Sequence, residues 1–122
     1  GMLVTLGEQA LRFEPGSATL ANQEPSALRE VNRFLATHPE VRVELRGHTD
    51  STGPAEANRA LSEQRAEAVQ EVLVSFGTSA ERIRIEGRGE QEPIADNRTA
   101  AGRRANRRVE ILLIADRSDL DG

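Results

Sequence analysis

An arginine interrupts an apolar stripe in the longest segment with helical spacing, residues 54–76. The stripe comprises Leu61, Arg65, Ala68, Val72 and Phe76, which fall on one face at helical periodicity. A guanidinium on an inward face is costly unless a carboxylate or a hydrogen-bonding partner compensates for its lost hydration. We therefore expect Arg65 to face an acidic group or an anionic ligand.

Asp50 is the acidic residue best placed to share a cleft with Arg65. It follows a strand-like segment, residues 41–46, in which apolar and charged residues alternate. A carboxylate at the end of a strand and an arginine on the next helix can meet at one edge of a sheet. Together they would form a receptor with one arm for an ammonium group and one for a carboxylate. The alternative is a purely structural salt bridge that closes the helix onto the sheet.

The remaining polar residues give no pattern typical of an enzyme or a metal centre. His38 and His48 are the only histidines, whereas a zinc site needs three or four ligands. We interpret His48 as a residue that orients a loop or is exposed. Ser51 and Ser62 have no base placed to activate them, and helix capping is their default role. We predict no catalytic residue, no metal and no cofactor.

Length and composition indicate one globular domain. The chain has 122 residues, 37% of them hydrophobic, a net charge of −4 and no cysteine. Aromatic residues make up only 2%, which disfavours base stacking, and the net acidity argues against nucleic-acid binding. The longest apolar run, residues 111–115, is far too short to span a membrane. We therefore expect contact with a membrane only through an upstream segment absent from this chain.

Periodicity and turn residues predict four strands and two main helices. The expected strands cover residues 3–6 together with 10–13, broken near Gly7, then 41–46, 83–86 and 109–114. The expected helices run from Pro25 to before Pro39 and over 54–76, with a stop at Gly77 and a further helical turn at 99–104.

This β-α-β-α-β-β order predicts an α/β (α+β) two-layer sandwich. Its four-stranded sheet should be mixed, because strand-helix-strand units imply parallel pairing. The middle strands carry charges on one face, so we expect helices on the other face only. The charged face should hold solvated cross-strand ion pairs.

Three ordered motifs resemble one known family. They are residues 47–53 (GHTDSTG), residues 58–66 (NRALSEQRA) and residues 106–110 (NRRVE), with a looser match at Phe13 and residues 16–20. Together they resemble the OmpA-like C-terminal domain, the peptidoglycan-binding module of outer-membrane proteins, Pal-type lipoproteins and MotB-type motor proteins. The similarity covers residues 4–115.

The resemblance implies a ligand and a set of contacts. Family members bind the stem peptide of peptidoglycan non-covalently through its diaminopimelate residue. Carried over, Arg65 would clasp a carboxylate and Asp50 would accept a hydrogen bond from the ammonium or a nearby N–H. The pocket wall would comprise Thr49, Thr52, Gly53, Asn58 and Leu61, and Arg108 would lie near the cleft. The loop Glu14-Pro15-Gly16 departs from the family pattern, so the resemblance does not extend to a role for this loop.

We therefore expect a single domain over residues 1–122, with a core at 4–115 and a flexible tail at 116–122, taken from a larger envelope protein. It would anchor that protein to the cell wall from the periplasm, at the outer membrane. Two alternatives stay open: a protein-interaction domain without ligand, and a peptidoglycan-processing amidase or peptidase. A homodimer is also possible, because the sequence does not decide the oligomeric state.

Overall fold

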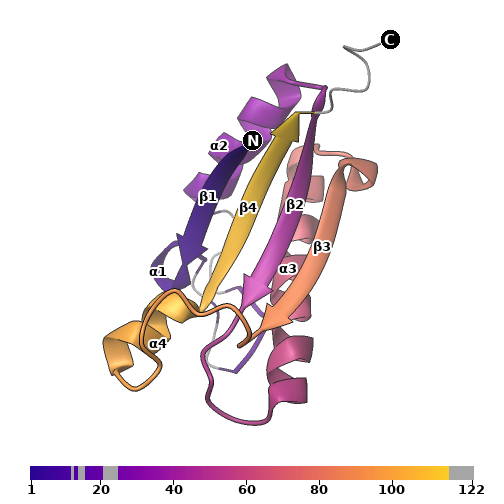
Figure 1. The fold of residues 1–122 in the computed structure, drawn as a ribbon. Coiled ribbons are helices and arrows are strands. Elements are labelled where there is room, and N and C mark those ends of the chain that lie inside the picture. The colour runs from indigo at the N-terminus through magenta and orange to yellow at the C-terminus, as the bar shows by residue number, and fades with distance from the viewer. Residues whose placement is uncertain (12, 14–15, 21–24, 116–122) are drawn as a thin grey trace.

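The computed structural model describes residues 1–11, 13, 16–20 and 25–115, arranged as one sheet with helices packed against it (Figure 1). The strands are β1 (Met2–Gly7), β2 (Val41–His48), β3 (Ile83–Gly89) and β4 (Arg108–Ala115). The helices are α1 (Glu8–Leu11), α2 (Ser26–Thr37), α3 (Ala55–Phe76), the 3₁₀ turn η1 (Ala80–Arg82) and α4 (Ala100–Asn106).

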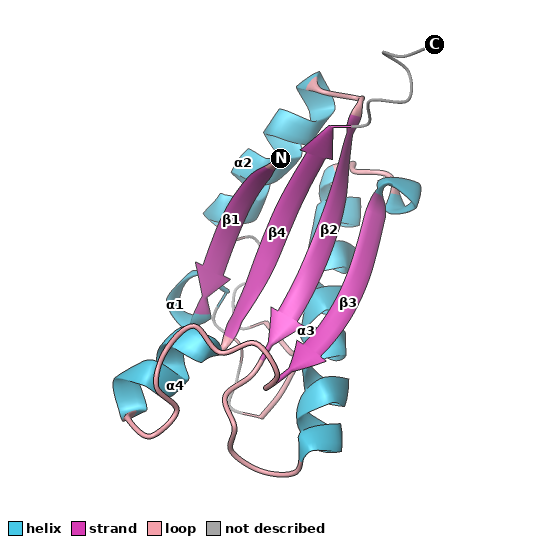
Figure 2. Cartoon of the chain, viewed as in Figure 1, coloured by secondary structure: helices cyan, strands magenta, loops and turns pink. Residues whose placement is uncertain are grey.

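The four strands form a mixed sheet in the order β1-β4-β2-β3. β2 pairs in parallel with β3 and antiparallel with β4, and β1 pairs antiparallel with β4. Figures 1 and 2 show α2 and α3 together on one face of this sheet. The predicted two-layer sandwich with a mixed four-stranded sheet is therefore confirmed.

The core lies between the sheet and these two helices. Alternation in β2 turns Val41, Val43 and Leu45 toward the helices, where each is buried. α2 contributes Leu28, Val31 and Leu35 to the same layer. The face of α3 with the deepest burial comprises Ser62, Ala66, Val69 and Leu73, all without solvent exposure. This most buried face is displaced by about one residue along the helix from the apolar stripe predicted above. Arg65 therefore lies at the margin of the buried face and not at its centre.

The prediction of a strand across residues 10–13 is wrong for the described part of that segment. The chain forms α1 instead, and this turn brings Leu11 into the core at 1% exposure. Phe13 then makes an isolated antiparallel bridge with Leu20. Burial of Leu11 thus overrides the local alternation that suggested a strand.

The long helix has the bounds that its sequence signals predict. α3 follows Pro54 and ends at Gly77, which adopts a left-handed conformation with φ of 119°. No described helix combines the length and the apolar character needed to cross a membrane. The expected flexible tail, residues 116–122, lies outside the residues that the structure describes.

Candidate functional site

A cleft of about 590 Å³ lies where the end of β2, the start of α3 and α4 meet the loop after α1. It is lined by Phe13, Gly16, Thr49, Asp50, Thr52, Asn58, Leu61, Arg65, Arg103 and Arg107. The structure therefore brings Asp50 and Arg65 to one cleft, as their positions in the sequence predict. Its volume is within the range of small-ligand sites.

Asp50 is held as an ionised acceptor. Its Oδ1 accepts a hydrogen bond from the backbone N–H of Thr52 at 2.8 Å, and its Oδ2 pairs with Arg107 Nη1 at 2.5 Å. Burial alone would raise the pKa of Asp50, but the Thr52 N–H and the Arg107 guanidinium lower it overall. The carboxylate is thus fixed in charge and direction at the cleft.

Arg65 is 6% exposed, and Ser17 and Phe13 are among the residues that orient it. Its Nε donates to the backbone carbonyl of Ser17 at 2.9 Å, and its guanidinium carbon lies 4.9 Å from the centre of the Phe13 ring. Stacking on the aromatic ring and this hydrogen bond restrict the orientation of the planar group. The guanidinium is thus held in a fixed direction at the cleft.

Most of the predicted wall residues line the cleft. Thr49, Thr52, Asn58 and Leu61 do so, whereas Gly53 is exposed and is not part of the lining. Asn58 Nδ2 donates to the Asp50 carbonyl and to Glu90 Oε1, both at 3.4 Å. Asn58 therefore ties the start of α3 to the loop that carries Asp50.

Arg108 does not line this cleft, but it lines a smaller pocket that shares Phe13, Arg65 and Arg107 with the cleft, so its role in ligand binding stays a prediction. In β4 the side chains of Val109, Ile111 and Leu113 face the helices, so Arg108 and Glu110 face the open side of the sheet. The Arg108 guanidinium contacts Glu110, the Glu92 carbonyl and the Asn106 carbonyl, at 3.0 to 3.2 Å. Arg107, one residue earlier, reaches the cleft. The alternation of side chains along the extended chain is the sequence signal that separates Arg107, which lines the cleft, from Arg108, whose guanidinium faces the open side of the sheet.

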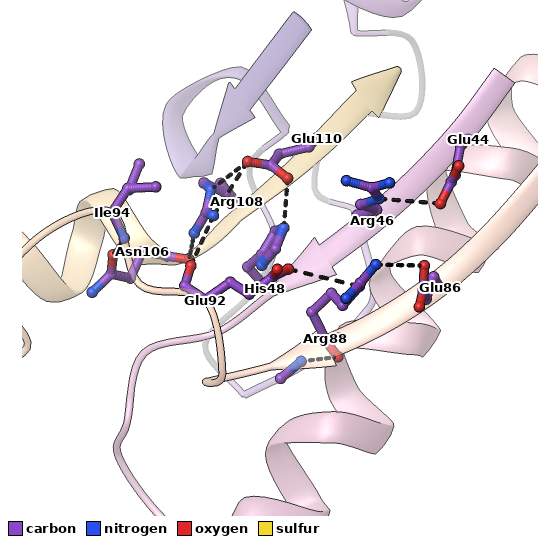
Figure 3. Close-up of polar contacts among 12 residues, drawn as sticks. Glu44, Arg46, His48, Glu86, Arg88, Glu92, Ile94, Asn106, Arg108 and Glu110 are labelled. Atoms are coloured by element: carbon purple, nitrogen blue, oxygen red, sulfur yellow. Dashed lines mark hydrogen bonds and ion pairs between the residues drawn. The ribbon is translucent and has the colours of Figure 1, made fainter. Parts of the chain in front are cut away.

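The open face carries a network of partly buried charges (Figure 3). Three of its ion pairs join residues two apart on one strand: Glu44–Arg46, Glu86–Arg88 and Arg108–Glu110. The prediction of solvated cross-strand pairs is therefore only partly correct. The cross-strand contact among the described residues is His48–Glu110, which is an ion pair only when His48 is protonated.

His48 is buried at 1% exposure, which excludes the exposed role considered for it. Its Nε2 lies 2.8 Å from Glu110 Oε1. Burial lowers the pKa of His48 and the Arg108 charge lowers it further, against the opposing effect of Glu110. His48 thus links the end of β2, two residues before Asp50, to the start of β4 next to Arg107.

Two cleft arginines, Arg103 and Arg107, were not predicted as site residues. Their position depends on the loop between β3 and α4, which Asn106 organises from a fully buried position. The side chain of Asn106 accepts from the N–H groups of Ile94 and Ala95 and donates to Asn97 Oδ1. Ser62 has a structural role, since its hydroxyl donates to the Arg59 carbonyl and accepts from Gly89 N–H. Among the described residues, no group of three or more His, Cys, Asp or Glu could hold a metal ion.

The sheet, its single helical layer and the charged cleft define an α/β ligand-binding domain. Comparison with known proteins identifies the family. A model of the OmpA family matches residues 12–107, and the chain belongs to this family.

Individual relatives agree with this assignment. The chain is 45% identical over 101 residues to the probable lipoprotein YiaD of Escherichia coli, covering 83% of this chain and 46% of that protein. The chain thus spans about half the length of that relative.

Two solved structures share the fold. The peptidoglycan-associated lipoprotein of Burkholderia pseudomallei matches with a TM-score of 0.80 and 26% identity over 90% of this chain and 89% of that one. The cell wall anchor of the type VI secretion system of Pseudomonas aeruginosa matches with a TM-score of 0.81 and 33% identity, over 93% and 80%. These relatives are named as a peptidoglycan-associated lipoprotein and a cell wall anchor.

Proposed function

We propose that this domain binds peptidoglycan non-covalently through the diaminopimelate residue of the stem peptide. Support comes from the names of its relatives, a peptidoglycan-associated lipoprotein and a cell wall anchor. The observation that carries the proposal is the presence of Asp50 and Arg65 in one cleft, each fixed by its own neighbours.

The free end of diaminopimelate is a zwitterion, with an ammonium and a carboxylate on one carbon. In the proposed complex the ammonium donates to the Asp50 carboxylate, which keeps acceptor capacity beyond its bonds to Thr52 and Arg107. The carboxylate receives the forked guanidinium of Arg65 in a charge-assisted contact. Thr49, Thr52, Asn58 and Leu61 form the surrounding wall.

We further propose that the domain anchors a longer envelope protein to the cell wall from the periplasmic side of the outer membrane. This rests on its relatives, which include an outer membrane porin F of Pseudomonas fluorescens that is 41% identical over 108 residues. The chain covers only 33% of that porin. Anchoring would therefore be the contribution of one domain to a larger molecule.

The first test is calorimetric titration with a stem peptide that contains diaminopimelate. We expect Arg65→Ala to abolish measurable binding and Arg65→Lys to bind poorly, because an ammonium cannot reproduce the fork. Arg59→Ala is the matched control, since Arg59 is an exposed arginine of the same helix outside the cleft lining. A peptide with lysine in place of diaminopimelate lacks the carboxylate and should bind more weakly. Unchanged affinity of Arg65→Ala would refute the proposed site.

Two further outcomes would favour other functions. A wild-type domain that binds no stem peptide would point to a protein-interaction domain without this ligand. Release of cleavage products from muropeptides would point to an enzyme. Because the described lining of the cleft contains no serine, cysteine or histidine, we expect muropeptides to be recovered intact.

A further inference from the structure

The described lining of the cleft is rich in arginine. Among the described residues, the lining carries three guanidinium groups, from Arg65, Arg103 and Arg107, and one carboxylate, from Asp50. Arg107 pairs with Asp50, and the proposed function assigns Arg65 to the diaminopimelate carboxylate. Arg103 is therefore the guanidinium of this described lining that neither the ion pair nor the proposed function engages.

Arg103 is held in place but is not neutralised by a described carboxylate. Its Nη1 donates to the Asn97 carbonyl at 3.0 Å, and this is the hydrogen bond that its side chain makes within the described part of the chain. A guanidinium has five N–H donors, so most of this fork is available to a ligand. The side chain is half-buried, which strengthens its interaction with an anion relative to bulk water.

The backbone that carries Arg103 is also closely packed. The neighbouring Gly102 lies so near the Asp96 carbonyl that a Cβ atom there would be 1.8 Å from its oxygen. Thr99 caps α4 by accepting from Gly102 N–H at 2.9 Å, and Asn97 is fixed by Asn106. The guanidinium is thus supported by a short helix whose position is determined by direct packing and by buried hydrogen bonds.

We propose that Arg103 is a specificity-determining residue that recognises a second free carboxylate of the stem peptide. This inference rests on the proposed function of the cleft. Two positions in a stem can supply the group. The glutamyl residue before diaminopimelate is linked through its γ-carboxyl and has a free α-carboxylate. A stem that ends at diaminopimelate has a free terminal carboxylate.

The test is a double-mutant cycle, in which the protein and the peptide are changed separately and then together. Wild-type protein and Arg103→Gln are titrated with a tripeptide that ends in diaminopimelate, and with two versions that carry a carboxamide at the glutamyl α-position or at the C-terminus. We expect amidation at one position to weaken wild-type binding about tenfold, as loss of a charge-assisted hydrogen bond implies. Arg103→Gln should bind the parent peptide about tenfold more weakly and should not distinguish it from that amide.

Controls separate recognition from a structural effect. Arg104→Gln changes the next arginine of α4, which is exposed and outside the cleft lining, and it should keep the discrimination of the wild type. Arg103→Lys retains the charge and should restore part of the discrimination. A purely structural role for Arg103 would weaken all three peptides equally.

The outcomes distinguish the two proposals. Wild-type protein that binds all three peptides with equal affinity, or Arg103→Gln that keeps the wild-type ratio between them, would overturn the role of Arg103 and leave the proposed function intact. Wild-type protein that binds none of the peptides would overturn the proposed function itself. The recognised carboxylate is the one whose amidation weakens binding to the wild type but not to Arg103→Gln.

Discussion

Gly47 allows α3 to approach β2 directly beneath the cleft, and its replacement by alanine should both destabilise the fold and disturb the site. A Cβ atom built on Gly47 would lie 2.0 Å from the backbone oxygen of Ser62 and 2.7 Å from its carbonyl carbon. An ordinary contact of this kind begins at 3.4 Å. The helix would therefore have to move away from the strand by about 1.4 Å, because backbone atoms cannot rotate aside as a side chain can.

The cost follows from this displacement. Insertion of a methyl group into a packed interior typically costs about 1–3 kcal/mol, and a clash with helix backbone places Gly47→Ala at the upper end, at about 3 kcal/mol. With a urea m-value of about 2 kcal/mol/M for a small domain, the unfolding midpoint should fall by about 1.5 M. Ligand affinity should fall as well, because β2 leads to Asp50 while α3 carries Arg65.

The assay is urea unfolding followed by circular dichroism, with Gly7→Ala as the matched control. A Cβ atom on Gly7 would meet nothing within 4 Å, although Gly7 also lies in a strand of the same sheet. Its midpoint should stay within about 0.3 M of the wild type, the range expected of a neutral surface substitution. If Gly47→Ala unfolds at the wild-type midpoint, the argument from close approach of strand and helix is refuted.

Three further predictions concern buried polar groups. Asp50→Asn should lose about 1 kcal/mol at pH 7. This loss should shrink in urea titrations below about pH 4, since the lowered pKa of Asp50 stabilises the fold only while the carboxylate is ionised. Wild-type stability should fall relative to His48→Gln between pH 7 and 5, because burial lowers the pKa of His48 and the unfolded chain takes up the proton first; parallel pH profiles would contradict this. Asn106→Ala should cost about 2–3 kcal/mol in thermal or urea unfolding, because it removes the acceptor of two loop N–H groups; an unchanged midpoint would show that water replaces it.

The fold was predictable because its main elements carry strong local signals. The segment that forms β2 alternates regularly, and α3 begins after a proline and ends at a glycine, so periodicity and end signals agree. The failure at α1 has a different cause. Ala10 and Leu11 are compatible with a strand locally, and only the position of the core shows that Leu11 must turn inward.

The placement of Asp50 and Arg65 in one cleft was predictable because the burial of Arg65 gave an energetic reason for it. A buried arginine needs a partner, and this requirement led from Arg65 to Asp50. The contributions of Arg103 and Arg107 were not accessible in the same way. They depend on how the loop after β3 folds around Asn106, and that loop has no periodic pattern from which its course could be derived.

Arg107 and Arg108 show that charge alone does not assign an arginine to a site. Neighbouring residues of an extended chain point to opposite sides of a sheet, so one of two consecutive arginines must face away from the cleft. Arg107 pairs with Asp50 in the cleft, whereas Arg108 contacts Glu110 on the open face. Glu110 in turn holds His48, so the charges behind the sheet join the same two strand ends that present Asp50 and Arg107 in front of it. The strand ends that carry the cleft residues Asp50 and Arg107 are therefore joined on the open face of the sheet by His48, Arg108 and Glu110, which are not part of the cleft lining.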